Sequence, residues 1–338
     1  MERKKEYKNI LLLNWGGIGD EILFMPVIKS LKEEFKNCKI TLALEPRSSA
    51  IVQLCPDIDN IIKTDIKASG IKKYINILKF LSGVWGKNFD LVISSGKSPL
   101  VAVLLFLTGI KERIGFRSKT SFLLTKSTEL NENQYASNMY HDLISPICDI
   151  TCSYPQIITD DDYKLPEGLY EGGFIALHPG VSKMSIKKNI LKCPDLSFWK
   201  NLIAALLEKG EKTVLFGTRD DEELISKIIE DEKISSNKNF VNYFNKTKSL
   251  LDMANMFKRA KCVICVDSAP MHVAVGVNAR TLAIFGPTNE KKLLPENEKF
   301  CVIKNNIPCR PCLWHKRAQN CEESGCLKID YKEIISKI

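Results

Sequence analysis

Short apolar runs alternate with segments of helical period along most of the chain, and this alternation limits the possible fold more than any other feature. In the first half, the apolar runs lie at 9–14, 39–44, 60–62, 90–93 and 112–116. Helical patterns lie between or after them at 21–35, 48–54, 71–81, 98–107 and 135–150. Because strands that alternate with helices pair in parallel, this half is predicted to be a doubly wound α/β domain.

The second half repeats the pattern. A strand-like run begins at Gly173, and others lie at 212–216, 240–242 and 262–265, with helical patterns at 196–209 and 249–257. The polar, turn-rich stretch between Asp149 and Gly173 is interpreted as the interdomain linker, and its three consecutive Asp residues as a solvated loop rather than a metal site. We therefore expect two Rossmann-like domains that face each other across a cleft.

One turn between a strand and a helix has the features of an anion site. The apolar run Cys262–Cys265 leads through Val266-Asp267-Ser268-Ala269-Pro270 into the helical segment Met271–Gly276. A helix start presents unpaired backbone N–H groups and the positive end of the helix dipole. The alternative is that Asp267 and Ser268 only cap this helix and that His272 packs against it.

A glycine-rich turn follows the first predicted strand. The sequence Gly16-Gly17-Ile18-Gly19-Asp20 fits neither the dinucleotide fingerprint nor the phosphate loop that ends in Gly-Lys. Its glycines can let the backbone approach a ligand and can aim Asp20 outward from the helix start. The alternative role for Asp20 is a helix cap.

Composition indicates a globular protein with two real cores and a moderately basic surface. The chain has 338 residues, 44% of them hydrophobic, and a formal net charge of +9. A basic excess suits an acidic substrate, an anionic membrane surface or nucleic acid, although most of the scattered lysines are expected only to solvate the surface. No run reaches the roughly 18 to 20 apolar residues needed to cross a bilayer, and the N-terminus lacks a secretory pattern. We therefore expect a cytoplasmic protein, with the membrane surface open as a location.

Taken together, several blocks resemble glycosyltransferase family 9, the heptosyltransferases of lipopolysaccharide assembly. The blocks are Gly16–Asp20, Ala176–Gly180, Gly217–Glu222, Val266–His272 and Phe285–Thr288. The resemblance spans about residues 9 to 335. It implies the GT-B fold, catalysis without a metal or other cofactor, and transfer of L-glycero-D-manno-heptose from an ADP-sugar with inversion at the anomeric carbon.

The resemblance also implies domain roles. Residues 1–165 would bind the acceptor and residues 173–328 the nucleotide sugar, while a final helix at 329–338 would pack back on the first domain. The implied partners are ADP-heptose, an anionic glycolipid acceptor and the cytoplasmic face of the inner membrane as a peripheral contact, with no nucleic acid.

Residue roles follow from the matched positions. Asp20 matches the proposed general base, which takes the proton of the acceptor hydroxyl. The departing diphosphate would be stabilised by the backbone amides of Ala269, Met271 and His272, which follow Ser268. The His272 side chain would assist them. Asp267 would orient sugar hydroxyls or His272.

The remaining donor-site roles are less tightly tied to the motif. Glu222, with Asp221 as its competitor, would accept hydrogen bonds from the ribose. Lys192 would face the phosphates, with Lys183 as the second choice, although Cys193 stands where the family commonly has Trp. Loop positions that bring backbone close to the ligands are Gly16, Gly17, Gly19, His178 and Gly180.

Four cysteines near the C-terminus form a separate candidate site. Cys309, Cys312, Cys321 and Cys326 lie in a Pro- and Arg-containing loop without strand or helix period, with His315 as a substitute ligand. Four thiols in one loop suit a structural zinc or iron ion, while reduced thiols or disulfides are the alternatives. By contrast, Cys262 and Cys265 fall on opposite faces of one strand and are expected to be structural.

The sequence thus predicts an inverting, metal-independent heptosyltransferase. Two alternatives stay open: a family 9 enzyme that uses another nucleotide sugar for a surface polysaccharide or glycoprotein, and a nucleotide-sugar-binding module without turnover.

Overall fold

The structure is a computed structural model that describes residues 6–181, 185, 190–313, 321 and 324–338. The chain divides into two compact units, Met1–Gln156 and Ile157–Ile338. The boundary lies within the predicted linker between Asp149 and Gly173 and before the predicted end of the first domain at residue 165. Residues from 157 onward run along the second unit, where the Arg259 guanidinium donates to the Asp160 and Asp161 carbonyls at 2.6 and 3.0 Å. The Asp160–Asp162 stretch is therefore a loop tied to this unit through its backbone.

The first unit contains one parallel sheet of six strands in the order β3-β2-β1-β4-β5-β6. The strands are β1 (Asn9–Leu13), β2 (Lys39–Leu44), β3 (Asn60–Lys63), β4 (Leu91–Ser94), β5 (Glu112–Phe116) and β6 (Lys126–Thr128). The helices are α1 (Ile18–Glu34), α2 (Ile71–Val84), α3 (Pro99–Leu107) and α4 (Ala136–His141), with 3-10 turns η1 (Pro46–Gln53), η2 (Ser121–Leu123) and η3 (Asp142–Ile144).

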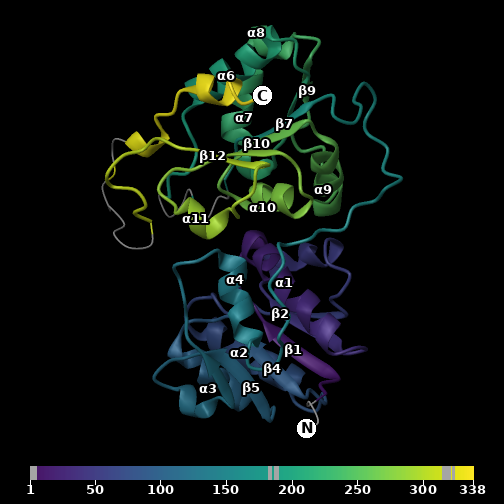
Figure 1. Cartoon of the computed structure of the whole chain (residues 1–338), viewed down its shortest axis with the longest axis vertical. Helices are drawn as coiled ribbons and strands as arrows, with labels where there is room; N and C mark the ends of the chain where they lie inside the picture. Colours follow the sequence, from purple (N-terminus) through teal and green to yellow (C-terminus); the bar gives the residue numbers. More distant parts are fainter. Residues whose placement is uncertain (1–5, 182–184, 186–189, 314–320, 322–323) are drawn as a thin grey trace. The chain divides into compact units, whose positions relative to one another are not determined.

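Helices cover both faces of this sheet. On one face, α2 and α3 bury Phe80, Leu81 and Leu105 against strand residues such as Leu11 and Val92. These helices lie next to each other in Figure 1. The predicted helix at 135–150 is instead the short α4 followed by η3, and the predicted helix at 48–54 is η1. Strand β6 was not predicted, because its polar sequence has no apolar run.

The second unit repeats the architecture with the sheet order β12-β11-β10-β7-β8-β9, again all parallel. Its strands are β7 (Ile175–His178), β8 (Thr213–Leu215), β9 (Phe240–Asn242), β10 (Cys262–Val266), β11 (Thr281–Ile284) and β12 (Phe300–Ile303). Its helices are α6 (Leu196–Glu208), α7 (Glu222–Ile229), α8 (Glu232–Ser235), α9 (Leu250–Arg259), α10 (Ala269–Gly276), α11 (Glu290–Leu293) and α12 (Tyr331–Ile335), with the 3-10 turns η4 (Arg219–Asp221) and η5 (Gly325–Leu327). The predicted α/β class of two doubly wound domains is confirmed.

The final helix corrects one prediction. We expected residues 329–338 to pack back on the first domain, but α12 packs against α6 of the second unit, as Figure 1 shows. Ile334 is fully buried in the core of this unit, together with Trp199 and Leu206 of α6. An apolar helix face indicates that a helix is buried but not which surface buries it, so the sequence could not decide this placement.

Candidate functional site

The predicted site residues gather in loops that follow strands of the two sheets. Loops after β1, β7, β8, β10 and β11 carry the five motifs that were singled out in the sequence. Parallel strands direct their carboxyl ends to the same edge, which is where ligands bind in open α/β sheets. Each unit therefore presents its own motifs at one edge of its sheet.

Asp20 lies in the first turn of α1, and its side chain is exposed. Its Oδ2 accepts a hydrogen bond from the Gly17 amide at 2.8 Å, and its Oδ1 accepts one from the Tyr140 hydroxyl at 3.4 Å. Asp20 therefore does cap the start of α1, as one of the two interpretations predicted. This cap still leaves an exposed carboxylate at the carboxyl edge of the first sheet, which is what a general base requires.

Steric contact with Asp20 explains why a glycine occupies position 16 in this loop. A Cβ atom at this position would lie 2.2 Å from the Asp20 Cβ. Any other residue would displace the Asp20 side chain, so the glycine keeps the helix start and this carboxylate in place.

Behind Asp20 lies a buried polar network that the sequence reasoning missed. Glu21 is only 1% exposed. Its Oε2 accepts from the Asn14 amide nitrogen at 3.0 Å and its Oε1 from the Gly16 amide at 3.4 Å, while Ser95 donates to the Asn14 Oδ1 at 2.5 Å. An Asp-Glu pair at a helix start could have suggested a second carboxylate, but burial of one member becomes visible only in the folded unit.

Burial raises the pKa of the Glu21 carboxyl to about 8, and the nearby Asp20 charge adds to this, while the Asn14 and Gly16 hydrogen bonds oppose it. The folded-state pKa thus lies above the ordinary value of 4.5. Between these two pH values the folded unit holds a proton that the unfolded chain has lost. The free energy of unfolding should therefore fall by about 1.4 kcal/mol per pH unit across this window.

Replacement of Glu21 by glutamine should remove this pH dependence. The glutamine side chain imitates the neutral acid, so the variant should be similar to wild type near pH 5 and increasingly more stable than wild type toward pH 8. Urea unfolding of both proteins at several pH values measures the difference, in which the other titrating groups cancel. A constant difference across the range would mean that Glu21 is ionised in the folded unit.

In the second unit, the structure brings together two residues that are 75 positions apart. The Lys192 ammonium forms an ion pair with Asp267 Oδ2 at 2.8 Å and donates to the Asp267 carbonyl at 3.3 Å. The Asp267 side chain is 3% exposed and that of Lys192 is 17% exposed. The sequence assigned separate roles to these residues, whereas the folded unit pairs their charges directly before α10.

The start of α10 agrees only in part with the prediction. Ala269 is its first residue, so its amide has no partner within the helix. The Met271 amide, however, donates to the Ser268 carbonyl at 3.0 Å, which corrects the expectation that it points to a ligand. Ser268 occupies the N-cap position without a capping hydrogen bond from its side chain, and His272 is buried. Burial of His272 agrees with packing against the helix, and its role toward a ligand stays a prediction.

The loops after β7 and β8 meet at Asp221. Its Oδ2 accepts from the Thr218 amide at 2.8 Å and from the Thr218 hydroxyl at 3.2 Å. A Cβ atom on Gly180 would lie 1.7 Å from the Asp221 Oδ1, so only glycine fits there. Asp221 is therefore committed to the loop, whereas Glu222 is exposed at the start of α7 and is the better candidate of the two for ribose.

His178 ends β7 and is buried. Burial lowers its pKa, although the nearby Asp221 charge opposes the shift. Its Nδ1 has no hydrogen-bond partner within the part of the chain that the structure describes. A neutral imidazole with an unpaired nitrogen next to Gly180 suits a role in the ligand loop, which agrees with its predicted position.

Arg310 links the cysteine loop to the loop after β11. Its guanidinium donates to the Gly286 carbonyl at 2.6 Å and the Thr288 carbonyl at 3.3 Å, and it pairs with Glu290 at 3.3 Å. The Cys312 amide donates to the Pro287 carbonyl at 3.0 Å. The sequence reasoning missed this connection, for which the only signal was an Arg inside the Cys-x-x-Cys motif.

The four predicted metal ligands are close enough to influence one another. Burial raises the pKa of the Cys312 and Cys326 thiols, and the other cysteines of the loop raise it further. No disulfide joins any of the twelve cysteines, all of which lie among the described residues. Among the described residues, no three or more His, Cys, Asp or Glu side chains adopt a metal-binding arrangement. His315 and Lys183 lie outside the described residues.

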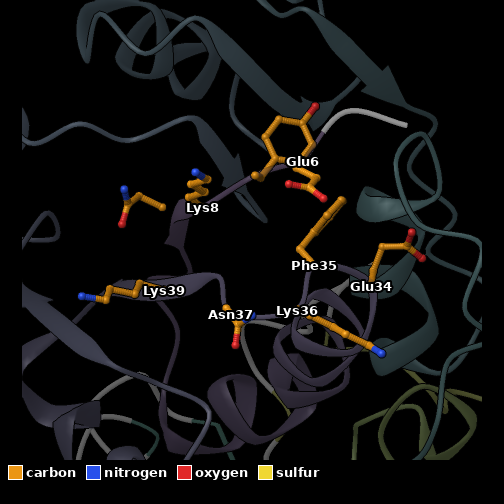
Figure 2. Close-up of a pocket in the computed structure, with 9 residues that line it drawn as sticks. Glu6, Lys8, Glu34, Phe35, Lys36, Asn37 and Lys39 are labelled. Atoms are coloured by element: carbon orange, nitrogen blue, oxygen red, sulfur yellow. The ribbon is translucent and has the colours of Figure 1, made fainter. Parts of the chain in front are cut away.

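A surface pocket of about 660 Å³ occurs at the other edge of the first sheet, as Figure 2 shows. It is lined by residues at the amino ends of β1 and β2 and at the end of α1, among them Lys8, Lys39 and Glu34. These side chains carry both signs of charge, and the sequence motifs lie elsewhere. None of the helices in the described part has the length and apolar character that a bilayer crossing requires.

Comparisons with known proteins agree with the motifs. The sequence model of glycosyltransferase family 9 (heptosyltransferase) matches residues 77–322. The chain is 24% identical to lipopolysaccharide heptosyltransferase 3 of Escherichia coli, over 80% of this chain and 81% of that protein. It is 22% identical to lipooligosaccharide heptosyltransferase 2 of Haemophilus influenzae, over 88% of both.

Solved structures agree on the fold. The E. coli ADP-heptose lps heptosyltransferase II matches with a TM-score of 0.72 and 19% identity, over 89% of this chain and 92% of that one. The E. coli heptosyltransferase WaaC with ADP-2-deoxy-2-fluoro heptose matches with a TM-score of 0.71 and 17% identity, over 97% of this chain and 99% of that one. The iron-containing dodecameric glycosyltransferase TibC of E. coli matches with a TM-score of 0.58 and 12% identity, over 98% of this chain and 76% of that one.

The two doubly wound units and the motifs at their carboxyl edges thus define an enzyme of the GT-B fold class. The chain belongs to glycosyltransferase family 9, the heptosyltransferase family, and is a glycosyltransferase.

Proposed function

We propose that this enzyme transfers a heptose from ADP-L-glycero-D-manno-heptose to a lipopolysaccharide core or a related glycolipid, with inversion and with Asp20 as the general base. The observation that carries the proposal is the exposed Asp20 carboxylate, held at the carboxyl edge of the first sheet by the Gly17 amide and the Tyr140 hydroxyl. The names of the relatives, all heptosyltransferases, support the sugar.

In the proposed reaction, an acceptor hydroxyl loses its proton to Asp20 while its oxygen bonds to the anomeric carbon. The bond from this carbon to the diphosphate breaks on the opposite face, and its electron pair stays on ADP. Negative charge therefore grows on the departing diphosphate, and donors that are already in place lower the barrier. The Ala269 amide and the Lys192 ammonium are the groups proposed for this task.

The ion pair between Lys192 and Asp267 supports this role. An unpaired carboxylate beside the start of α10 would repel a diphosphate, and Lys192 offsets its charge. Glu222, exposed at the start of α7, is proposed to accept hydrogen bonds from the ribose hydroxyls. The chain needs no metal ion for these steps, since cationic and amide donors take the place of one.

Calorimetric titration of the purified protein with ADP, UDP, GDP and CDP, without added metal, tests the proposal. Selective ADP binding is expected and would be followed by a transfer assay with ADP-heptose and a lipopolysaccharide-core acceptor. Selective binding of another nucleotide would keep the mechanism but overturn the sugar donor. ADP binding without transfer would favour a nucleotide-sugar-binding module without turnover, and absence of binding of all four nucleotides would contradict both the enzyme and the module.

A second proposal concerns the cysteine loop, which we propose holds one structural zinc or iron ion through Cys309, Cys312, Cys321 and Cys326. Two observations support it: the four thiols lie in one loop of the sequence, and the similar protein TibC is described as iron-containing. The four side chains do not stand in a metal-binding arrangement in the described residues, so binding of the ion would have to draw them together. Thiolates are the protein ligands that both metals accept. The Arg310 contacts would connect such a centre to the Gly286–Thr288 loop.

Elemental analysis of protein purified under reducing conditions tests this proposal. We expect close to one equivalent of zinc or iron per chain, and its loss in Cys312→Ser. The matched control is Cys152→Ser, a free thiol of the first unit, which should retain the metal. Equal metal content in all three proteins, or none in wild type, would contradict the assignment.

A further inference from the structure

Helix α2 carries an apolar stripe on its outer face. Ile71, Tyr74 and Leu78 are 78, 66 and 61% exposed, and Ile75 between them is also exposed. Their spacing of i, i+3, i+4 and i+7 places them on one side of the helix. The opposite side buries Phe80, Leu81 and Val84 in the core of the first unit, so the outer stripe is not needed for that core.

Helix α3 and the turn η2 extend this surface. Both helices pack on the same face of the sheet, through Phe80 of α2 and Leu105 of α3, and lie side by side in Figure 1. At their ends, the Trp85 indole donates to the Leu107 carbonyl at 2.9 Å. Leu100 and Phe106 of α3 are also exposed, and Phe122 of η2, which packs against α3, is 81% exposed. We call the set Ile71, Tyr74, Ile75, Leu78, Leu100, Phe106 and Phe122 the outer apolar face.

Lysines accompany the outer apolar face. Residues 66–108 contain six lysines and a single acidic residue, Asp90. Two of these lysines, Lys67 and Lys97, form ion pairs with Glu45 and Glu132. Asp90 is occupied at the amino edge of the sheet, where it accepts hydrogen bonds from the Lys8 and Asn9 amides at 2.7 and 2.8 Å. Lys72, Lys73 and Lys79 are exposed on α2 itself. A mobile ammonium on a long stem can stay in water while apolar neighbours enter a lipid interface.

We infer that the outer apolar face is the surface by which the enzyme docks on an anionic lipid bilayer. Apolar and aromatic side chains among lysines are the composition of helices that lie in a membrane interface. A second copy of the chain fits less well, because a two-fold contact would bring the same lysines together. This inference rests on the proposed function in one respect only. A glycolipid acceptor lies in a membrane, and this would explain why the outer apolar face lies on the first unit, which is proposed to bind the acceptor.

The test is sedimentation of the full-length protein with vesicles of phosphatidylcholine alone and of phosphatidylcholine with one quarter phosphatidylglycerol. Wild type should bind the anionic vesicles at least tenfold more strongly, and high salt should weaken the binding. Ile71→Ser, Tyr74→Ser and Leu78→Ser combined should lower binding to anionic vesicles at least tenfold. Lys72→Gln, Lys73→Gln and Lys79→Gln combined should lower it by a larger factor, since each lysine near such a surface contributes about fivefold.

The matched control removes three exposed lysines from the second unit, Lys233, Lys238 and Lys246, by the same Gln substitutions. It has the same net charge as the α2 lysine variant and should bind like wild type. Equal loss in both variants would mean unspecific attraction and would overturn the docking face. A change of oligomeric state in the serine variant without lipid would assign the face to a second copy instead.

Two further measurements separate this inference from the proposed function. ADP binding and transfer to a soluble acceptor fragment should be unchanged in the serine variant, because its side chains lie on the outer side of α2. Intact ADP binding without any vesicle binding in wild type would overturn the docking face alone. Vesicle binding without ADP binding would overturn the donor assignment and leave the docking face standing.

Discussion

Replacement of Asp20 by Asn is expected to lower kcat for glycosyl transfer by about 10²- to 10⁴-fold, the usual contribution of a general base. The amide is isosteric with the carboxylate and retains an oxygen that can accept the hydrogen bond from the Gly17 amide. The start of α1 should therefore stay intact, while the group can no longer take a proton. Steady-state kinetics measure the transfer rate, and calorimetry of the same protein measures the nucleotide affinity; these are the two readings.

The matched control is Asp162→Asn, the same chemical change at an exposed loop residue of the second unit. It should change neither reading. Transfer by the Asp20 variant within threefold of wild type would remove Asp20 from the mechanism. Equal losses of transfer and of nucleotide affinity would instead point to a structural role at the helix start.

Replacement of Lys192 by Met is the second large effect that we expect. It should weaken nucleotide binding at least tenfold and lower the free energy of unfolding of the second unit by about 3 kcal/mol, because the buried Asp267 loses its ion pair. Nucleotide titration and denaturant unfolding measure the two effects. Lys200→Met is the control, since the Lys200 pair with Asp231, at 3.4 Å, is more exposed and should contribute under about 1 kcal/mol.

The double variant Lys192→Met with Asp267→Asn separates the two roles of Lys192. Removal of both charges should restore most of the stability, because no unpaired carboxylate is left inside the unit. Nucleotide binding should stay weak, because the cation that we propose to face the diphosphate is still absent. Recovery of nucleotide binding in the double variant would show that Lys192 serves only to neutralise Asp267.

The pattern of strands and helices could be predicted closely because it is local. The apolar runs that became β1, β2 and β4 are continuous, and such runs between helical segments specify buried parallel strands. The edge strand β6, with the sequence Lys-Ser-Thr, has no such signal and forms because β5 offers a free edge. The break of the predicted helix at 135–150 into α4 and η3 likewise has no local signal of its own.

The sequence predicted the loops of the candidate site, but not the contacts between their residues. Motif loops and glycines singled out Asp20, His178, Asp267 and Glu222, and the structure places these residues at or shortly after the carboxyl ends of strands. Two contacts depend on backbone geometry that the spacing of residues in the sequence does not encode. They are the ion pair of Lys192 with Asp267 and the hydrogen bond from the Met271 amide to the Ser268 carbonyl.

The sequence by itself determined two doubly wound units, the positions of the motif loops and the family to which the chain belongs, because strand and helix periods and short motifs are local properties. Only the tertiary structure decided that Glu21 is buried behind Asp20, that Arg310 holds the Gly286–Thr288 loop and that α12 packs on α6. It also decided that the stripe on α2 stays exposed. These outcomes depend on which surfaces meet after residues far apart in the chain come together, and burial, charge pairing and pKa values follow from that meeting.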